Sequence, residues 1–586
     1  MKFIYILAFL FLSQVSISGQ IPNWVAPVGS DSDDYVSDVA VDAVGNVYSV
    51  GRFLNWADFD PGLPNINMNT FTVDKGNLFV VKYSPAGNLI WVKQIGGDKG
   101  VSVNAVDAEY LHPKIALDGL GNFYITGLYD YRMDLDPSPS SSFFLSDIPG
   151  IGATYRFVGK YTTDGGFVWA KRIGGNDNLG CVFNNMKVDN LGNIYFAGNF
   201  WNTVDFDPGT GTFNLTSDNN YDIFMMKLDT QGNFVWAKKI GNPGQEDIVK
   251  KMVIDNQHMY ITGSYKGLVD FDPQSTVSNL QSVGNTFDGY LAKYSLSDGS
   301  LQWAQSIGSG VGADSGFAIQ VDNSGNVYTS GHFKGSVDFN SDPINTAILT
   351  NTGTSYSTYF LKLSSTGQFI WVKRFTAMGA LYPSEQKPYD IAVKGNKVYL
   401  AGYFLVSMDC NPDDNQQYVI TANGDNYDMF IISLDTDGIF SGAKSFGGIL
   451  HDYLYTIAID NNEDIIIGGK YSEDVNFNPA ITNINVSGVY DGFTVKLSKN
   501  MFLKTTDVAL PVKLNVYPNP TTDQITVQSK SRIKDVTVYS IDGKLIFSKN
   551  TDGKSAVIDL KGLNAGVYLI HINSGSQTFV EKIIKK

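Results

Sequence analysis

The strongest constraint on this chain is a stretch of sequence that recurs seven times. Its clearest copy runs from Asp189 to Trp236 and contains a Gly-Asn pair, a tyrosine, a glycine and an Asp-Phe-Asp-Pro segment. In every copy the tyrosine position is followed by glycine three residues later and by aspartate or asparagine ten residues later. A self-similar, strand-rich period of roughly 70 residues predicts a β-propeller. The tyrosine positions are Tyr48, Tyr124, Tyr195, Tyr260, Tyr328, Tyr399 and, in the seventh copy, Ile466.

Each copy contains four short strand-like runs, separated by glycine and asparagine turns. In the first copy these runs are Asp38–Val41, Asn46–Val50, Leu78–Lys82 and Leu89–Lys93. Turn residues of this kind favour antiparallel hairpins, and the repeats show no convincing helical periodicity. The sequence therefore predicts an all-β fold, a seven-bladed β-propeller with four antiparallel strands in each blade.

The two ends of the repeat array predict how the ring closes. The seventh copy reaches Asp491–Lys496 and lacks the tryptophan strand that ends most of the earlier copies. A strand-like segment with a tryptophan, Asn23–Gly29, precedes the first copy. Pairing this segment with the last blade would remove the free sheet edge of an open array. We therefore expect the N-terminal strand to complete the seventh blade.

Composition divides the chain into four parts. Residues 1–19 contain a lysine, the apolar run Phe3–Leu12 and a small-residue end, which is typical of a secretory signal peptide. Residues 20–498 hold the repeats, and residues 499–512 form a linker. Residues 513–586 are lysine-rich and contain seven short strand-like runs, which predicts a small C-terminal β-sandwich. No later apolar run reaches membrane length, so we expect no transmembrane segment in the mature chain.

The formal net charge of -15 limits the partners of the chain. Nucleic acids and anionic membrane surfaces attract proteins with a basic face, so neither is an expected partner. The five histidines share no metal-ligand spacing, and the chain has no nucleophile elbow or phosphate loop. We therefore assign no catalytic residue and expect no cofactor apart from a candidate calcium ion.

The Asp-Phe-Asp-Pro segments are the candidate calcium sites. In extended backbone the two aspartates of a segment face the same side, and carboxylates are ligands that calcium accepts. Two side chains fall short of the about six to eight oxygens that calcium takes, and two later copies keep the turn while replacing charge with asparagine. The alternative is a structural turn in which the aspartates bond nearby backbone. The candidate ligands are Asp58, Asp60, Asp205, Asp207, Asp270 and Asp272.

Three insertions interrupt the even spacing of the repeats: Asp98–Pro113, Pro137–Tyr155 and Thr376–Lys387. Loops carry binding residues more often than scaffold positions do. These insertions are therefore the first places where we expect a binding surface, and neutral loop growth is the alternative.

The repeat text Asp-x-x-Gly-Asn-x-Tyr-x-x-Gly, as in Asp322–Gly331, resembles the bacterial β-propeller repeats (SBBP-like repeats) of large secreted proteins. The resemblance covers most of the chain and implies the propeller fold. It implies little about activity, because propellers host unrelated functions.

The C-terminal part resembles the sorting domain of type IX secretion substrates in Bacteroidetes. Four motifs stand in order: Tyr-Pro-Asn-Pro-Thr, Asp-Gly-Lys, Gly-Val-Tyr and a basic end. The resemblance implies contact with the type IX secretion machinery and a secreted, extracellular or outer-membrane-surface location. The residues that carry it are Tyr517, Pro518, Asn519, Pro520, Asp542, Gly543, Lys544, Gly566, Tyr568, Lys585 and Lys586.

Two classes of function fit this sequence. The first is a secreted or cell-surface binding scaffold for a protein or a glycan. The second is a polysaccharide-acting hydrolase or lyase with a site on the propeller face. We favour the scaffold, because enzymatic propellers break their repeat to build a pocket and this repeat is nearly even. Clustered acids and exposed aromatic residues around the central channel would favour the enzyme. A shallow, polar and uniform face would favour the scaffold.

Overall fold

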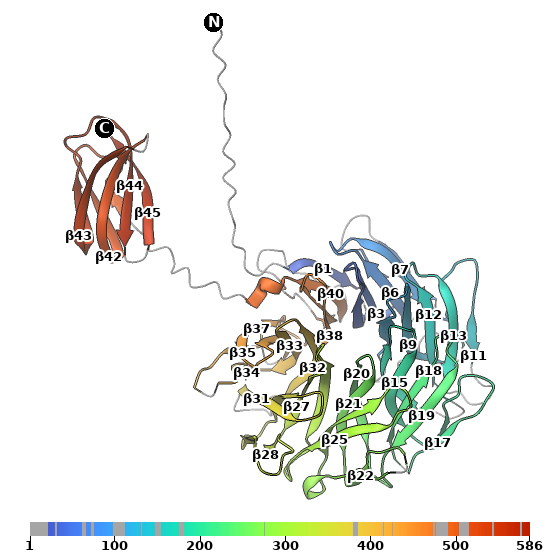
Figure 1. The fold of residues 1–586 in the computed structure, drawn as a ribbon. Helices are drawn as coiled ribbons and strands as arrows, with labels where there is room; N and C mark the ends of the chain where they lie inside the picture. Colours follow the sequence, from blue (N-terminus) through green and yellow to red (C-terminus); the bar gives the residue numbers. More distant parts are fainter. Residues whose placement is uncertain are drawn as a thin grey trace. The chain divides into compact units, whose positions relative to one another are not determined.

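The structure is a computed structural model of the chain (Figure 1). It forms two compact units, Met1–Phe502 and Leu503–Lys586. The predicted signal peptide and residues 503–514, which include most of the predicted linker 499–512, lie outside the described residues. Among the described residues, no helix combines the length and apolar character needed to cross a membrane. The structure describes residues 22–29, 32–60, 66–71, 76–97, 112–130, 132–146, 154–174, 181–218, 220–274, 276–378, 385–413, 415–424, 426–472, 475, 477, 490–502, 515–541, 544–574 and 577–586.

The first unit is a seven-bladed β-propeller, which confirms the predicted fold class. Each blade is built on four antiparallel strands, with first strands such as β20, β32 and β38 toward the middle and fourth strands such as β7 and β19 at the rim (Figure 1). Neighbouring first strands contact one another around the ring.

The strands follow one another in sequence order within each of the first six blades. Blades one to three contain β2 (Tyr35–Val41), β3 (Val47–Leu54), β6 (Gly76–Tyr83), β7 (Leu89–Ile95); β8 (Lys114–Leu117), β9 (Asn122–Asp130), β12 (Thr154–Thr162), β13 (Phe167–Ile173); and β14 (Cys181–Val188), β15 (Ile194–Phe200), β18 (Asp222–Leu228), β19 (Phe234–Ile240). Blades four to six contain β20 (Ile248–Ile254), β21 (His258–Tyr265), β24 (Asp288–Ser295), β25 (Leu301–Ile307); β26 (Ser315–Val321), β27 (Val327–Phe333), β30 (Ser357–Leu363), β31 (Phe369–Met378); and β32 (Gln386–Lys394), β33 (Lys397–Leu405), β36 (Tyr427–Asp435), β37 (Phe440–Phe446).

The seventh blade is closed by the N-terminal strand, as predicted. Its strands are β38 (Tyr453–Ile459), β39 (Ile465–Tyr471), β40 (Asp491–Leu497) and β1 (Pro22–Val28), and β1 pairs antiparallel with β40. Trp24 of β1 is 9% exposed and lies in a core shared with the first blade. This strand therefore covers the edge of β40 and joins the two ends of the ring.

The aspartate six residues before the repeated tyrosine stabilises the turn between the first and second strands. Asp189 Oδ1 accepts hydrogen bonds from the backbone N–H groups of Leu191 (3.0 Å) and Asn193 (2.8 Å). Its Oδ2 accepts from the Asn193 side-chain amide (2.8 Å) and the Tyr195 hydroxyl (3.1 Å). Because every donor is close in sequence, each copy of the text fixes its own hairpin and places its own tyrosine.

The repeated tyrosine, lysine and tryptophan hold each blade to the next. In the first blade Tyr48, Lys82 and Trp91 lie beside one another on three paired strands. The Lys82 ammonium and the Trp91 indole donate hydrogen bonds to the carbonyl of Thr163 in the second blade, at 3.1 and 3.3 Å. Such contacts can form only when successive blades are docked. Equivalent hydrogen bonds reach Ser365 from Lys293 and Trp303, Thr436 from Lys362 and Trp371, and Pro85 from Lys496 and Trp24.

The sixth blade has Gly442 where the other blades have the tryptophan. A short 3-10 helix, η3 (Lys499–Phe502), follows the last blade and buries Met501. The Phe502 ring lies beside Gly442, and its centroid is 5.8 Å from that of Tyr399. The residue after the propeller strands thus supplies the aromatic ring that the sixth blade lacks.

In the described part of the propeller, six short hairpins stand between second and third strands. The hairpin of the sixth blade also pairs with β31 of the fifth, with Thr376 opposite Asp409, so these strands form one six-stranded sheet. A second 3-10 helix, η2 (Val283–Asn285), follows the fourth hairpin. The hairpin strands are β4 (Trp56–Asp58), β5 (Asn67–Asn69), β10 (Arg132–Asp134), β11 (Phe144–Ser146), β16 (Thr203–Asp205), β17 (Asn214–Thr216), β22 (Leu268–Asp270), β23 (Asn279–Gln281), β28 (Gly335–Asp338), β29 (Ile348–Asn351), β34 (Ser407–Asp409) and β35 (Val419–Thr421).

The second unit is a β-sandwich-like domain, as predicted, but it has five strands rather than seven short ones. The strands are β41 (Asn515–Tyr517), β42 (Gln524–Ser540), β43 (Leu545–Asp559), β44 (Gly566–Ser574) and β45 (Gln577–Lys585). β42 and β43 each join two predicted runs, because their pairing shifts register between Gln528 and Ile533 instead of ending there. The first part of β42 pairs with β41 and the second part with β44. An irregularity of this kind bends a strand without terminating it.

Candidate functional site

The first and third strands of each blade begin at the same end of the propeller. We name this end the hairpin face. The hairpins between second and third strands stand there, as do the connections from each fourth strand to the next blade. The three insertions identified in the sequence therefore all belong to this face. Residues 98–111, 147–153 and 379–384 of these insertions lie outside the described part of the chain.

A β-bulge interrupts the first strand of six blades near the hairpin face. A bulge re-aims a side chain, which is why bulges are frequent beside binding sites. In blades four to seven, which are consecutive around the ring, the extra residues are Lys250, Phe317, Tyr389 and Tyr455. The inner strands of these four blades thus carry one lysine and three aromatic residues at equivalent positions.

Aromatic side chains continue across the hairpin face from the seventh blade to the fifth. The rings of Tyr453 and Tyr403 are in edge contact, with centroids 5.0 Å apart. Phe317 packs against His332 at 4.8 Å, and His332 lies 4.4 Å from Tyr356. We name Tyr453, Tyr403, Phe317, His332 and Tyr356 the aromatic path. Tyr403 is buried, and the other four residues of the path are half-buried.

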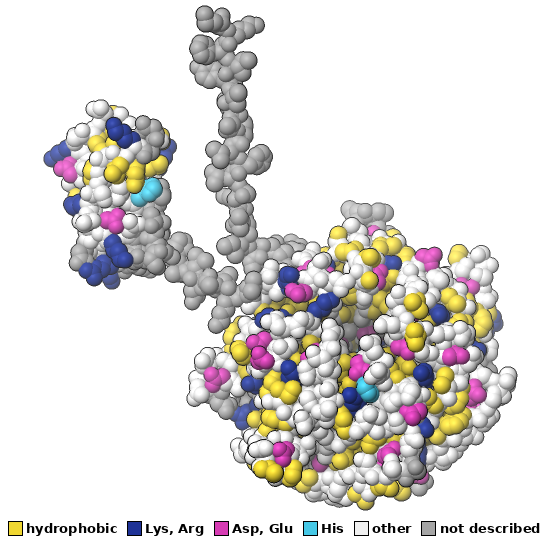
Figure 2. All heavy atoms as spheres, viewed as in Figure 1, with side chains coloured by type: hydrophobic (Ala, Val, Ile, Leu, Met, Phe, Trp, Pro, Cys, Tyr) yellow, Lys and Arg dark blue, Asp and Glu magenta, His cyan; other side chains and the backbone are white. Residues whose placement is uncertain are grey.

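Lys387 connects the two halves of the aromatic path. Its ammonium group lies 5.6 Å from the centroid of Phe317 and 5.9 Å from that of Tyr403. Burial lowers the pKa of His332 to about 4, so this ring is neutral at pH 7 and acts as an aromatic surface. Figure 2 shows hydrophobic, basic and acidic side chains interspersed over one face of the propeller.

The first strands are basic although the chain is acidic. Together they carry six lysines and two aspartates. The two aspartates are engaged with neighbouring groups: Asp38 accepts the Ile115 N–H at 3.1 Å, and Asp390 pairs with Lys251 at 3.0 Å. Of the six lysines, Lys250 and Lys387 stand near the start of their strands at the hairpin face, whereas Lys394 ends β32 at the opposite end, where it donates a hydrogen bond to Asn461.

Buried aspartates brace the loops of the hairpin face. Asp314, before β26, accepts backbone N–H groups of Ser309 (2.7 Å) and Lys334 (2.8 Å). Removal from water disfavours a charged carboxylate, so burial raises the pKa of Asp314 to about 7. Burial likewise raises the pKa of Asp247 and Asp428 to about 7, and that of Asp288 to about 6.

The raised pKa of Asp428 predicts that its contribution to stability falls as the pH rises. The folded pKa of about 7 lies above the ordinary 3.8, so between these values the unfolded chain releases the proton first and the free energy of unfolding decreases. Asp428→Asn cannot ionise and should lose less thermal stability than the parent between pH ~5 and pH ~8. Thermal unfolding of both proteins at both pH values measures this. Equal losses would contradict the raised pKa.

The Asp-Phe-Asp-Pro segments form the bend after the first strand of each hairpin. Asp205 Oδ1 accepts backbone N–H groups of Asp207 (3.0 Å) and Phe213 (2.8 Å), which ties the two sides of the loop together. Phe206 is fully buried, and its ring lies 4.8 Å from that of Phe224. Among the described residues, no group of three or more His, Cys, Asp or Glu side chains is placed to hold a metal ion. The same pairs of hydrogen bonds are accepted by Asp58, from Asp60 and Ile66, and by Asp270, from Asp272 and Ser278.

We expect Phe206→Ala to destabilise the propeller more than Asp207→Asn. Removing a buried phenylalanine costs about 3–5 kcal/mol, whereas Asp207 Oδ1 accepts one N–H, from Gly209 at 2.8 Å, a hydrogen bond worth about 1 kcal/mol. Melting temperatures with calcium or a chelator test the remaining calcium hypothesis. A calcium-dependent rise of many degrees that Asp205→Asn abolishes would make Asp205 and Asp207 ligands.

A pocket of about 270 Å³ lies on the hairpin face of the fifth blade. Its lining comes from Thr350–Ser357, which runs from the end of β29 through a loop to the start of β30, and from Arg374, Thr376 and Ala377 on β31. The lining contains threonine and serine hydroxyls, an asparagine amide, the Tyr356 ring and the Arg374 guanidinium, and it contains no acid. Tyr356 also ends the aromatic path, so the pocket and the path are continuous.

Sequence reasoning located the region of this pocket but not its chemistry. The insertion Thr376–Lys387 begins at its wall, and two residues of the fifth copy, Ser357 and Thr376, depart from the repeat there. The aromatic path was missed, because the copies were not compared position by position outside the repeat motif. Such a comparison shows that His332 and Tyr403 occupy the same position of the fifth and sixth copies, four residues after the repeated tyrosine position.

The sorting motifs, distant in sequence, meet within the second unit. Asn519 Nδ2 donates a hydrogen bond to the Lys582 carbonyl (2.6 Å), and its Oδ1 accepts the Ile584 N–H (2.9 Å). Lys585 is buried, and its ammonium group donates to the Thr522 carbonyl. The hydrogen bonds between the Tyr-Pro-Asn-Pro-Thr segment and the basic end therefore fix β45 in its place in the sheet. Asp542 and Gly543 lie outside the described residues.

Comparison with known proteins identifies this second unit. Residues 515–586 match the family of secretion system C-terminal sorting domains. A stretch of 233 residues, 37% of this chain, is 27% identical to an uncharacterized WD repeat-containing protein, L264, of Acanthamoeba polyphaga mimivirus, and covers 17% of that protein.

Two solved structures align with most of the chain at low similarity. One is PorZ, described as an essential bacterial surface component of the type-IX secretion system of Porphyromonas gingivalis, with 96% of this chain and 100% of that chain covered, 10% identity and a TM-score of 0.15. The other is a quinohemoprotein alcohol dehydrogenase from Comamonas testosteroni, with 86% and 79% covered, 10% identity and a TM-score of 0.34.

Proposed function

Because the chain carries a sorting domain that directs secretion to the cell surface or beyond, we propose that its propeller is an extracellular glycan-binding scaffold. The observation that carries this proposal is the aromatic path on the hairpin face, from Tyr453 to Tyr356. The ligand site is the accessible side of this path, and a glycan chain lies along it.

The chemistry of the path suits a sugar polymer. The C–H faces of sugar rings are apolar and pack on aromatic rings, whereas their hydroxyl groups need polar partners at the edge. Phe317 and His332 supply half-buried rings, and Lys387 lies between Phe317 and Tyr403 as a hydrogen-bond donor. Several rings in succession favour an extended ligand over a single small molecule.

The surrounding charges support binding more than hydrolysis. Glycosidases of the common type need two carboxyl groups flanking the scissile bond. On the first strands, Asp38 and Asp390 each bond a neighbouring group: Asp38 the Ile115 N–H and Asp390 the Lys251 ammonium. Lys250 and Lys387, near the start of their strands at the hairpin face, favour a ligand with anionic groups.

A glycan array with the full chain tests the proposal. We expect a restricted set of polysaccharides to bind, and Phe317→Ala to weaken binding by about tenfold or more, because truncating a central aromatic contact typically costs 1–2 kcal/mol or more. Trp201→Ala is the matched control, because Trp201 is an exposed aromatic residue of the third blade, 45% exposed and outside the path.

Two outcomes would overturn the proposal. One is the absence of glycan binding by a folded parent protein, and the other is an equal effect of Phe317→Ala and Trp201→Ala. Melting temperatures of both variants exclude loss of folding as the cause. Release of shorter sugars from a bound polysaccharide, followed by chromatography, would instead establish the hydrolase or lyase alternative.

A further inference from the structure

The fifth blade departs from the repeat at two positions that line its pocket. Ser357 stands at the start of its third strand, and Thr376 stands near the end of its fourth. In the third blade the corresponding residues are Asp222 and Gly241, and a Cβ added to Gly241 would lie 2.3 Å from Asp222 Oδ1. The aspartate and the glycine are therefore coupled, since the acid fills the space that a side chain would need. The same Asp and Gly pairs recur as Asp288 and Gly308, Asp428 and Gly447, and Asp491 and Gly29.

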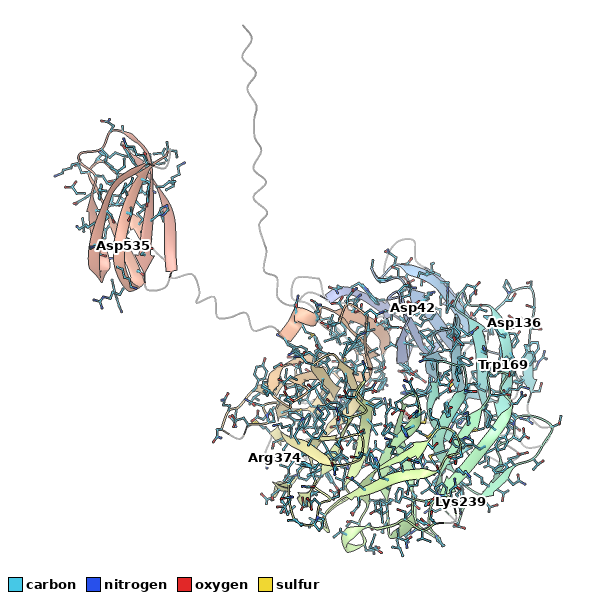
Figure 3. All side chains as sticks on the ribbon, viewed as in Figure 1. Asp42, Asp136, Trp169, Lys239, Arg374 and Asp535 are labelled. Atoms are coloured by element: carbon cyan, nitrogen blue, oxygen red, sulfur yellow. The ribbon has the colours of Figure 1, made fainter. Side chains whose placement is uncertain are left out.

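Arg374 is the positively charged residue of this pocket. The third blade shows which contacts the residue at this position makes in an ordinary copy of the repeat. The equivalent residue there is Lys239, which pairs with Asp218 at 2.5 Å and with Asp222 at 3.3 Å. In the fifth blade Ser357 holds the position of Asp222, and the loop before it, Thr352–Tyr356, contains no acid. The basic residue of the repeat is therefore kept, whereas both of its acidic partners are absent. Figure 3 labels Lys239 and Arg374 in their two blades.

The lining of the pocket matches one class of group. Arg374 donates a hydrogen bond to the Thr350 carbonyl at 2.7 Å, which fixes the guanidinium at the wall. A guanidinium binds carboxylate or sulfate oxygens through paired, charge-assisted hydrogen bonds. The hydroxyls of Ser357 and Thr376 both donate and accept, as sugar hydroxyls require. Pockets that hold drug-sized ligands measure about 300–1,000 Å³, so a pocket of about 270 Å³ suits a single monosaccharide-sized group.

We propose that the fifth-blade pocket binds one acidic sugar residue, bearing a carboxylate or a sulfate group, of the glycan held on the aromatic path. This proposal rests on the proposed function, because Tyr356 both lines the pocket and ends the path. The pocket sets the preference for charged glycans, whereas the path holds the neighbouring sugars.

Titration of the full chain with simple glycosides tests the pocket. The probes are methyl glucuronide, methyl glucoside 6-sulfate and neutral methyl glucoside at millimolar concentrations, followed by calorimetry or ligand-observed NMR. We expect the parent to bind at least one charged probe about tenfold or more tightly than the neutral one, because hydrogen bonds to an ionised group are stronger than those to a neutral hydroxyl. Whether the carboxylate or the sulfate binds more tightly identifies the natural substituent.

Two variants should remove this preference by different routes. Arg374→Gln deletes the charge. The double variant Ser357→Asp with Thr376→Gly restores the ordinary repeat and places a carboxylate in the pocket, and the other blades show that this pair folds. The control Lys239→Gln makes the matched change in the third blade and should keep the preference. A folded Arg374→Gln protein that still prefers the charged probe, or a parent without any preference, would overturn the proposal.

The outcomes also separate this proposal from the proposed function. If Phe317→Ala abolishes polysaccharide binding while Arg374→Gln changes neither affinity nor charge preference, the path stands and the pocket assignment fails. If the charged glycosides bind through Arg374 but no polysaccharide binds the parent, the pocket is a small-molecule site and the proposed function fails.

Discussion

Deleting residues 20–30 is expected to destabilise the whole propeller more than any single substitution. The deletion removes β1, exposes the full edge of β40 and separates the last blade from the first. It also removes the buried side chains of Trp24, Ala26 and Val28. We expect a fall in melting temperature on the order of 10 °C or more, since 1 kcal/mol shifts the melting temperature of large domains by a few degrees. An unchanged melting temperature would contradict closure by this strand.

A substitution within β1 separates the contribution of one side chain from that of the whole strand. The Trp24 indole donates a hydrogen bond to the Pro85 carbonyl at 3.1 Å and packs against Tyr83 with ring centroids 5.6 Å apart. Trp24→Ala should therefore cost roughly 3–5 kcal/mol. Trp201→Ala is again the control and should change stability little. Faster limited proteolysis of the deletion variant, starting in the seventh blade, would show the opened edge directly.

Truncating the chain after Ser574 is expected to stop its export and leave it in the periplasm. The truncation removes β45, which pairs with β44 along its length, and with it the basic end of the sorting domain. It also removes the partners of Asn519, the Lys582 carbonyl and the Ile584 N–H. Cell fractionation in a host with the type IX machinery measures the effect. Circular dichroism should show that the propeller of the truncated protein still folds, because the two units are separately compact.

The matched variants for this experiment are point changes in the sorting domain. Asn519→Ala removes the two hydrogen bonds to β45 and should reduce export, whereas Lys561→Ala changes an exposed lysine outside the motifs and should not. Fusing residues 513–586 to an unrelated periplasmic protein should send that protein out of the cell. A fusion that stays in the periplasm, together with normal export of the truncated protein, would contradict a sorting role.

The sequence predicted those features that depend on neighbours along the chain. The hairpin turns follow from Asp189, Asn193 and Tyr195, whose hydrogen bonds all lie within one short segment. The number of blades follows from the repeat, and closure follows from the unmatched strand around Trp24. Sheet pairing of this kind is readable because alternation along each strand and turn chemistry both point to the same register. The sorting motifs could be predicted because they follow one another in a recognisable order along the sequence.

The tertiary structure decided what depends on neighbours in space. Phe502 fills the place beside Gly442, and nothing in the local sequence of either residue indicates this contact. The seven short strands of the C-terminal domain became five, because a register shift bends β42 instead of ending it.

By itself, then, the sequence determined the blades, their closure and the presence of a sorting domain, because turn residues, a strand left unmatched by the repeat and the order of the motifs can all be read along the chain. Only the tertiary structure brought Phe317, His332 and Tyr356 into one path and placed that path beside Arg374. These residues come from the inner strand, the second strand, the loop before the third strand and the outer strand of the fifth blade. Their meeting depends on how a blade twists and how blades dock around the ring, and no periodicity along the chain records that geometry.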